Sequence, residues 1–320
     1  RRPAMAEAGE EFARARHVRF FKSHLQLMPN AYISLDTSRL TAIYFAVHGL
    51  DLLGALEEVD ASAVVEYIYR NQVLPTSSTP PALCGFRGSP SHGPPPAGGL
   101  DQAHSAMTYT GLATLVTLGD DLSRVDREAV VAGIGALQKE NGSFVATVEG
   151  SENDMRFLYC ACAVSALLDD WRGVDMDRAV AYIKSCLQYD GGIGLSPGQE
   201  SHGGSSYTAV ASLVLMGRLH DMGPTFVDDL THWCLNRQCG GFQGRPNKDA
   251  DTCYSFWVGA TLRLLGRFHL THEATTRGFV LQECQQKAMG GFSKVPGNPP
   301  DVLHSFYSVT WLSLAGLCGV

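Results

Sequence analysis

The sequence predicts an all-α protein, an α/α toroid of about six helix-pair repeats. Glycine-rich turns recur along the chain at nearly constant spacing. Each turn joins a helix with one apolar face to a second helix that is apolar almost all round, and strand patterns are nearly absent. Helices that are apolar on every side are buried on every side, so the second helix of each pair is expected to form an inner layer.

Two concentric layers of helices favour a ring that closes on itself, an α6–α6 barrel. A repeat of about 50 residues also fits an open superhelix, which is the alternative arrangement. In either arrangement, residues 1–320 are expected to form a single domain.

The glycine turns set the repeat length. They read NGSF, DGGI, CGGF and MGGF and end at Phe144, Ile193, Phe242 and Phe292, with separations of 49, 49 and 50 residues. Glycine suits such a tight reversal because it tolerates positive φ. A fifth turn, at 84–86, lies 58 residues before Phe144. We assign the excess to an insertion at 89–99 within a proline-rich loop at 87–104, because prolines interrupt helices.

The expected helices follow the turns in order. The N-terminal pairs are Phe12–Met28 with Ser38–Leu53, and Ala61–Gln72 with Met107–Leu118. Later outer helices include Arg127–Gln138 and Phe226–Leu235, and the later inner helices are Met155–Leu168, Ser206–Met216, Cys253–Leu265 and Leu303–Leu317. Because each inner helix begins just after a turn, the N-termini of the inner helices are expected to meet at one end of the toroid.

Composition narrows the class of protein. Apolar residues make up 45% of the chain and the net charge is −7, so a large core is expected and a nucleic-acid surface is not. No apolar run reaches the length of a membrane span, and the N-terminus lacks the apolar segment of a signal peptide. The nine cysteines are odd in number and scattered, which favours a reducing cytoplasm without disulfides. Cys160 and Cys162 are expected to be core residues.

Three residues form a candidate metal site. Asp251 and Cys253 stand at the start of one inner helix, and His304 stands at the equivalent start of the next. A mixed oxygen, sulfur and nitrogen set of three protein ligands is typical of a catalytic zinc with one open position. The structural alternative is that Asp251 only caps its helix, Cys253 is core and His304 is a surface histidine.

The same loops carry basic and hydrogen-bonding side chains. They are Arg156, His202, Arg245, Lys248, Tyr254 and Lys294. In an acidic protein this local excess of cations suits a substrate with phosphate groups, and helix N-termini would add positive partial charge. The open metal position could take a thiol, which would ionise there, or a water, which would make a hydrolase. A hydrolase needs a general base, and we take Glu200 as the only candidate among the glutamates of these loops, so a diphosphate leaving group is favoured.

At this point the motifs resemble those of a known family. DADTCYSFW at 249–257, ESHGG at 200–204, NDMRF at 153–157 and DVLHSFY at 301–307 look like the β subunit of a protein prenyltransferase. The resemblance runs from RHVRFF at 16–21 to the final helix. Among the classes of this family, the chain is most similar to protein geranylgeranyltransferase type I.

The resemblance implies a heterodimer with a separate prenyltransferase α subunit in the cytoplasm. The reaction would move a geranylgeranyl group from its diphosphate to the cysteine of a C-terminal CaaX motif with Leu favoured at X, as in small GTPases. One zinc ion per chain would be held by Asp251, Cys253 and His304. The implied contacts to the isoprenoid diphosphate are His202, Arg245, Lys248, Tyr254, Lys294, Arg156, Tyr159, Trp257 and Thr41. The implied peptide pocket is Thr37, Phe45, His104, Ala106, Phe157 and Leu303.

Two positions separate the classes of the family. Thr41 stands where the farnesyl enzyme has a tryptophan that shortens the isoprenoid cavity, and Lys294 stands where that enzyme has an aspartate that helps to bind magnesium. Magnesium is therefore not expected to be required. The alternatives are a farnesyl or Rab-type β subunit, a terpene cyclase-like toroid, and a non-enzymatic binding ring. Terpene cyclases use acidic motifs, but Asp169-Asp170 and Asp228-Asp229 are expected at helix ends or turns.

Overall fold

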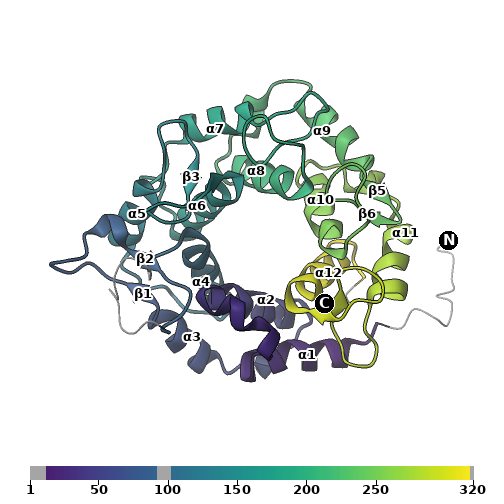
Figure 1. Ribbon diagram of the computed structural model, residues 1–320, viewed down its shortest axis with the longest axis horizontal. Helices are drawn as coiled ribbons and strands as arrows, with labels where there is room; N and C mark the ends of the chain where they lie inside the picture. Colours follow the sequence, from purple (N-terminus) through teal and green to yellow (C-terminus); the bar gives the residue numbers. More distant parts are fainter. Residues whose placement is uncertain (1–11, 92–101, 318–320) are drawn as a thin grey trace.

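The computed structural model describes residues 12–91 and 102–317. In these ranges the helices form two concentric rings (Figure 1). The inner ring consists of α2 (Arg39–Leu52), α4 (Ser105–Thr117), α6 (Met155–Leu168), α8 (Gly203–Leu215), α10 (Thr252–Leu264) and α12 (Val302–Leu314). The outer ring consists of α1 (Arg14–Gln26), α3 (Ala61–Tyr69), α5 (Arg127–Ala136), α7 (Met176–Ser185), α9 (Phe226–Leu235) and α11 (Glu273–Gly278). The predicted all-α toroid is confirmed.

The ring closes between its first and last repeats. Each inner helix packs against the next along the chain, and α12 packs against α2. The outer layer closes at the same seam, where Arg16 donates to the Ala288 carbonyl at 2.7 Å. His17 lies 2.9 Å from Gln285 Oε1 and accepts the Gly291 N–H at 2.9 Å. The open superhelix is therefore excluded.

The glycine turns need glycine for two separate reasons. Gly142 has φ +86° and Gly290 has φ +85°, a region that other residues rarely adopt. A Cβ on Gly142 would also lie 2.0 Å from the Arg178 carbonyl, and one on Gly290 would lie 2.2 Å from the Arg16 carbonyl. These two turns thus pack directly on the backbone of the next outer helix. The residues that end the five turns are fully buried: Phe86, Phe144, Ile193, Phe242 and Phe292.

Short strands depart from the prediction of almost no β structure. Within residues 12–91 and 102–317, four antiparallel pairs of two residues each form where a turn meets the segment beside it. They are β1 (Gln72–Val73) with β2 (Gly85–Phe86), β3 (Phe144–Val145) with β4 (Asn153–Asp154), β5 (Gln238–Cys239) with β6 (Gly241–Phe242), and β7 (Phe292–Ser293) with β8 (Pro300–Asp301). A two-residue ladder is too short to leave an alternating pattern in the sequence.

Some helix boundaries also differ from the prediction. The helix expected at Ser206 begins at Gly203, because the His202 side chain caps its N-terminus. The last inner helix ends at Leu314, followed by Gly316 with φ +71°. The sixth outer helix continues as a π-helix, η6 (Phe279–Cys284). Short 3₁₀ segments are η1 (Asn30–Ser38), η2 (Leu56–Glu58), η3 (Pro81–Leu83), η4 (Leu219–Met222) and η5 (Phe268–Leu270).

Two other predictions concern the loop and the cysteines. Of the insertion at 89–99, residues 92–99 lie outside the described part of the chain. Cys160 and Cys162 are buried, as predicted. The eight described cysteines are all free thiols.

The N-termini of the inner helices meet at one end, which we call the N-terminal rim. The first or second backbone N–H of each inner helix reaches a residue of the neighbouring repeat. These bonds are Leu40 to the Gly88 carbonyl, Ser105 to Ala146, Met155 to Leu195, Gly203 to Gly244, Thr252 to Lys294, and Val302 to the Tyr32 hydroxyl. The opposite end, where the inner helices finish, is the C-terminal rim. A cyclic set of hydrogen bonds thus fixes the loops of the N-terminal rim relative to one another.

Midway between the rims, aromatic side chains form a belt inside the inner ring. Each inner helix contributes an aromatic residue five or six positions after its N-cap: Tyr44, Tyr109, Tyr159, Tyr207, Trp257 and Tyr307. Ring centroids of neighbours along this series lie 4.5–5.8 Å apart, and Phe306 closes the belt 5.5 Å from Tyr44. We call these residues, with Phe306, the aromatic belt.

Candidate metal centre and cavity

The three residues predicted to hold a metal lie together on the N-terminal rim. One ligand atom from each of Asp251, Cys253 and His304 lies within 4.8 Å of the other two. Asp251 and Cys253 are only 6% and 7% exposed. Asp251 Oδ1 lies 3.3 Å from His304 Nε2. The start of α10 supplies the first two side chains and the first turn of α12 supplies the third.

Asp251 also has the structural role that was the alternative. Its Oδ1 accepts the Cys253 N–H at 2.9 Å, which caps α10. Its other oxygen lies 3.7 Å from Lys294 Nζ. The cap fixes the carboxylate at the mouth of the helix, where it faces His304. Capping and ligand geometry are therefore compatible in one side chain.

Asp301 completes the arrangement, and it was missed from the sequence. Its Oδ2 lies 2.6 Å from His304 Nδ1, and its Oδ1 accepts the His304 N–H at 2.9 Å. Because Nδ1 of His304 donates to Asp301, Nε2 is left as the acceptor that faces Asp251. Histidines that bind metals are commonly held in this way, with one ring nitrogen on a carboxylate and the other free for the metal. The sequence signal was an aspartate at the cap of the last inner helix, three residues before the histidine.

The electrostatics of the cluster favour a cation. Burial, and then the charge of Asp251, raises the pKa of the Cys253 thiol well above its ordinary value. Burial raises the pKa of Asp251, but hydrogen bonds with His304 and Cys253 outweigh it and the net shift is downward. Burial opposes protonation of His304, but the two aspartates raise its pKa to about 9. A bound divalent metal would offset the cost of burying a carboxylate and of ionising a buried thiol. This set of donors fits zinc.

A cavity of about 400 Å³ lies beside the cluster on the N-terminal rim. Its walls include Arg156, Glu200, His202, Arg245, Tyr254 and Trp257. The structure thus brings together five of the side chains predicted to contact the isoprenoid diphosphate. A mixed apolar and polar lining of this size is typical of a small-molecule site.

His202 fixes the direction of a hydrogen bond in this cavity. Its Nδ1 accepts the Gly204 N–H at 3.0 Å, so the ring proton is on Nε2, which lies 3.0 Å from the Tyr254 hydroxyl. Nε2 therefore donates to the Tyr254 oxygen, and the tyrosine keeps its own proton for another acceptor. Burial lowers the pKa of His202, and burial with the nearby Cys253 and Asp251 raises the pKa of Tyr254. Both groups are thus neutral hydrogen-bonding groups near pH 7.

The predicted positive patch is offset by carboxylates that the sequence analysis did not pair. Arg156 lies 2.6 Å from Asp154 and 3.0 Å from Glu152. Arg245 lies 3.0 Å from Glu200, and Lys294 contacts Asp251 as described. Lys248 is exposed and does not line the cavity. The resulting rim has several cations held in place by acidic neighbours.

Two other predicted isoprenoid contacts, Tyr159 and Thr41, do not line the rim cavity. Tyr159 is in the aromatic belt rather than in the lining of the rim cavity. Thr41 is half-buried on α2, with its hydroxyl 3.7 Å from the Met107 sulfur. Both side chains belong to inner-ring helices, each two helices away from α10, which carries Trp257.

The predicted peptide pocket is only partly assembled. His104 caps α4 by accepting the Ala106 N–H at 3.1 Å, and its ring lies 5.9 Å from that of Phe157. The Arg156 guanidinium lies 5.2 Å from the Phe157 ring centroid. These residues form one group at the starts of α4 and α6.

The remaining predicted pocket residues lie elsewhere on the ring. Phe45 is buried against the rings of Phe306 and Tyr307, at 5.4 and 5.6 Å. Thr37 lies in η1, and Leu303 lies in the first turn of α12, packed on the core. Phe45 thus has a core role at the seam of the ring.

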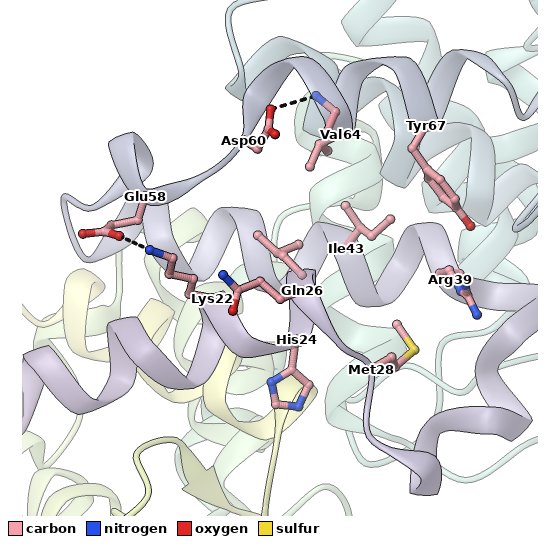
Figure 2. Close-up of a pocket in the computed structure, with 12 residues that line it drawn as sticks. Lys22, His24, Gln26, Met28, Arg39, Ile43, Glu58, Asp60, Val64 and Tyr67 are labelled. Atoms are coloured by element: carbon pink, nitrogen blue, oxygen red, sulfur yellow. Dashed lines mark hydrogen bonds and ion pairs between the residues drawn. The ribbon is translucent and has the colours of Figure 1, made fainter.

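A larger hollow of about 520 Å³ lies between α2 of the inner ring and α1 and α3 of the outer ring (Figure 2). Its walls carry ionised groups that are already paired, such as Lys22 with Glu58 at 2.5 Å and Arg39 with Asp36 at 2.5 Å. None of the metal-cluster residues lines it. The N-terminal rim is therefore the better candidate site.

Helix length bears on membrane insertion. Among the helices in the described ranges, α2 and α6 are the longest at 14 residues, and none is long and apolar enough to cross a bilayer.

Comparison with known proteins identifies the family. Residues 12–319 match the prenyltransferase alpha-alpha toroid domain. The chain is 41% identical to the geranylgeranyl transferase type-1 subunit beta of Arabidopsis thaliana, covering 98% of this chain and 87% of that one. It is 38% identical to the same subunit of Dictyostelium discoideum, covering 93% and 90%.

A solved structure agrees with this result at the level of the fold. The protein geranylgeranyltransferase-I of Candida albicans, complexed with GGPP, superposes with a TM-score of 0.85 at 23% identity, over 96% of this chain and 92% of that one. The family resemblance inferred from the sequence motifs is thus confirmed, and the chain belongs to the prenyltransferase α–α toroid family, with type-1 geranylgeranyl transferase β subunits among its relatives.

Proposed function

We propose that this chain is the catalytic β subunit of a type I protein geranylgeranyltransferase. It would transfer a geranylgeranyl group from its diphosphate to the cysteine thiol of a C-terminal CaaX motif, with Leu preferred at X. The observation that carries the proposal is the Asp251–Cys253–His304 cluster beside a cavity lined by His202, Tyr254 and basic side chains. The names of the 41% and 38% identical relatives support the choice of donor and class.

In this reaction the acceptor sulfur bonds to C1 of the isoprenoid while the C1–O bond breaks. Diphosphate leaves with the bonding electron pair, and the thiol proton passes to solvent. Asp251, Cys253 and His304 would hold zinc, whose positive charge favours the thiolate form of an acceptor cysteine. Asp301 would keep His304 in the ligating tautomer.

The diphosphate would be met by this chain's hydrogen-bond donors. Tyr254 has its hydroxyl proton available because His202 donates to its oxygen, so it can donate to a departing phosphate oxygen. Arg245 and Lys248 would add positive charge, and Arg245 would exchange Glu200 for phosphate. Arg156, Trp257 and Tyr159 would contact the isoprenoid, and His104, Ala106 and Phe157 would contact the peptide.

We further propose that zinc is required and magnesium is not. Lys294 Nζ lies 3.7 Å from Asp251, so an ammonium group already sits beside the proposed zinc ligands. As a point charge it can face the phosphate oxygens without a coordination geometry of its own. The test is single-turnover transfer across a magnesium titration. The parent rate should be flat and a Lys294→Asp variant should respond; a steep magnesium response of the parent would contradict the role of Lys294.

The term "β subunit" in the names of the relatives supports a heterodimer with an α subunit, which we propose to assemble in the cytosol. The main experiment is therefore co-expression with a prenyltransferase α subunit. Zinc content is then measured, together with transfer from C20 and C15 donors to peptides that differ only at X. We expect one zinc per chain and C20 transfer to Leu-ending peptides, both lost in Cys253→Ala. Preference for the C15 donor would indicate the farnesyl class, and cyclised donor without transfer would indicate a cyclase.

Thr41→Trp tests the donor assignment within the same assay. The indole side chain of tryptophan would fill volume next to Met107, on the neighbouring inner helix. Overpacking costs about 1–3 kcal/mol, so the preference should move toward the C15 donor by roughly tenfold or more. An unchanged donor ratio would contradict the placement of Thr41 in the isoprenoid site.

A further inference from the structure

A second cavity lies inside the ring on the other side of the aromatic belt. It has a volume of about 410 Å³ and is lined by the C-terminal halves of α4 and α6, by α2 and by the end of α8. It shares no lining residue with the cavity that contains His202 and Tyr254. We call it the distal chamber; of the residues that line it, Tyr159 is the one that is also proposed to contact the isoprenoid.

The wall of the distal chamber nearest the belt is a row of hydroxyl groups. The Tyr44 and Tyr109 hydroxyl oxygens are 3.1 Å apart, and those of Tyr109 and Tyr159 are 3.2 Å apart. Beside Tyr44, the His48 Nδ1–H donates to the Tyr44 carbonyl at 2.8 Å, so its Nε2 accepts from the Thr117 hydroxyl at 3.0 Å. Hydroxyl groups both donate and accept, so this row offers both functions to a ligand hydroxyl.

The rest of the distal chamber is apolar and uncharged. Ala113, Ala166, Leu167 and Leu215 contribute to its walls, and none of its described lining residues is Asp, Glu, Lys or Arg. Burial raises the pKa of Tyr44 to about 12 and lowers the pKa of His48, so both are neutral near pH 7. An anionic or cationic ligand would find no counter-charge here.

The mouth of the distal chamber is apolar as well. Val116 is 44% exposed and Leu215 is 39% exposed at the C-terminal rim. Apolar side chains gathered at the opening of a cavity mark a site for an apolar ligand. We propose that the distal chamber binds a neutral aliphatic alcohol, with its hydroxyl on the tyrosine row and its hydrocarbon chain along the apolar wall and mouth.

The test is equilibrium dialysis, which measures binding of labelled 1-decanol to the full chain. The chain is assembled with its partner subunit where it requires one. Geranylgeranyl diphosphate is present at saturation, so that the rim cavity is filled. We expect one molecule bound per chain. Ala166→Phe, which fills the distal chamber, should weaken binding about tenfold or more. Tyr109→Phe, which removes the central hydroxyl of the row, should weaken it about three- to tenfold.

Val214→Phe is the matched control, because it adds the same ring to the C-terminal rim outside the lining of the chamber. It should leave decanol binding unchanged, and retained donor binding by each variant shows that the variant is folded. Full displacement of decanol by the diphosphate donor, or an unchanged affinity in Ala166→Phe, would overturn the proposal. Equal binding of decanoate would overturn its requirement for a neutral head group.

Discussion

The two rims of the toroid solve the same problem in different ways. At the N-terminal rim, inner helices must satisfy free backbone N–H groups, and in five of six they use side chains as acceptors: His104, Asp154, His202, Asp251 and Asp301. At the C-terminal rim, the inner helices end in a residue with positive φ, which is glycine in five cases: Gly54, Gly119, Gly217, Gly266 and Gly316. One rim therefore collects polar side chains, and the other needs none.

This difference explains why the chemistry lies at one end. Oxygen and nitrogen acceptors that cap a helix are also the groups that bind metals and donate or accept protons. Asp251 caps α10 and is also a candidate metal ligand, and His202 caps α8 while it donates a hydrogen bond to Tyr254. A site can thus be built at the N-terminal rim from residues that the fold already requires. The glycines of the C-terminal rim offer no such groups.

The largest difference between the two rims is expected in the loss of stability when a glycine is replaced by alanine. Gly142→Ala places a Cβ 2.0 Å from the Arg178 carbonyl in addition to its positive φ, whereas Gly217 has positive φ with nothing within 4 Å. We expect Gly217→Ala to cost about 1 kcal/mol and Gly142→Ala to cost several times more. Urea unfolding followed by circular dichroism measures both. Equal losses would show that the turns do not depend on close packing against the next outer helix.

Substitutions of Asp251 should separate its two roles. Serine can replace aspartate as a helix cap but is a poor metal ligand, so Asp251→Ser and Asp251→Ala should both lose bound zinc. In the metal-free form, the alanine variant should be about 1 kcal/mol less stable than the serine variant. Zinc analysis and unfolding in chelator check the two effects. A serine variant that retains zinc would remove Asp251 from the ligand set.

The tautomers of the two histidines that cap inner helices should differ from that of His48. Nδ1 accepts a backbone N–H in His104 and His202, whereas in His48, which lines the distal chamber, it donates to a carbonyl. Nitrogen NMR should therefore find the proton of the first two on Nε2 and that of His48 on Nδ1.

Burial lowers the pKa of all three histidines, so below about pH 6.5 the unfolded chain takes up protons that the folded chain refuses, and stability falls as pH falls. His202→Asn keeps a cap and should reduce this slope between pH 7.5 and 5.5. An unchanged slope would mean that His202 is protonated in the folded state.

Exposed ion pairs should give the smallest effects on stability. Asp177 contacts Arg218 at 2.9 Å on α7, away from the site, and Glu200 contacts Arg245 at 3.0 Å on the N-terminal rim. Neither Asp177→Ala nor Glu200→Ala should shift the melting temperature measurably, because exposed pairs are screened by solvent. Only Glu200→Ala should tighten binding of inorganic diphosphate, by releasing Arg245. Calorimetric titration measures the affinity of both variants for diphosphate. An equal change in affinity in both would contradict a role of Arg245 in anion binding.

The sequence was most informative where residues recur in register. Turns spaced by about 50 residues predicted the helix pairs and placed Asp251 and His304 at equivalent positions of neighbouring repeats. Asp301 escaped notice because an aspartate before a helix has an ordinary explanation as a cap, and only its 2.6 Å contact with His304 distinguishes it. The acidic partners of Arg156 and Arg245 escaped for a related reason, since pairing depends on side-chain geometry.

The aromatic belt was not predicted, although the residues that form it follow a pattern in the sequence. An aromatic residue five or six positions after each inner-helix cap is visible in the sequence once the caps are known. Without the caps, Tyr109 and Tyr159 look like ordinary residues of apolar helices. The hydroxyl row and the distal chamber follow from the distances between neighbouring helices, which no single helix pattern contains.

The seam of the ring joins the first part of the chain to be synthesised to the last, so the ring can close only late in synthesis. Arg16 and His17 leave the ribosome early, yet their hydrogen-bond partners, Ala288 and Gln285, follow 272 and 268 residues later. Phe20 likewise shares a core cluster with residues of the last helix, such as Trp311. A nascent chain therefore carries an uncompleted apolar edge through nearly all of its translation, when such surfaces are prone to aggregate. The apolar residues of α1 in this cluster are fully covered only after α12 has been synthesised.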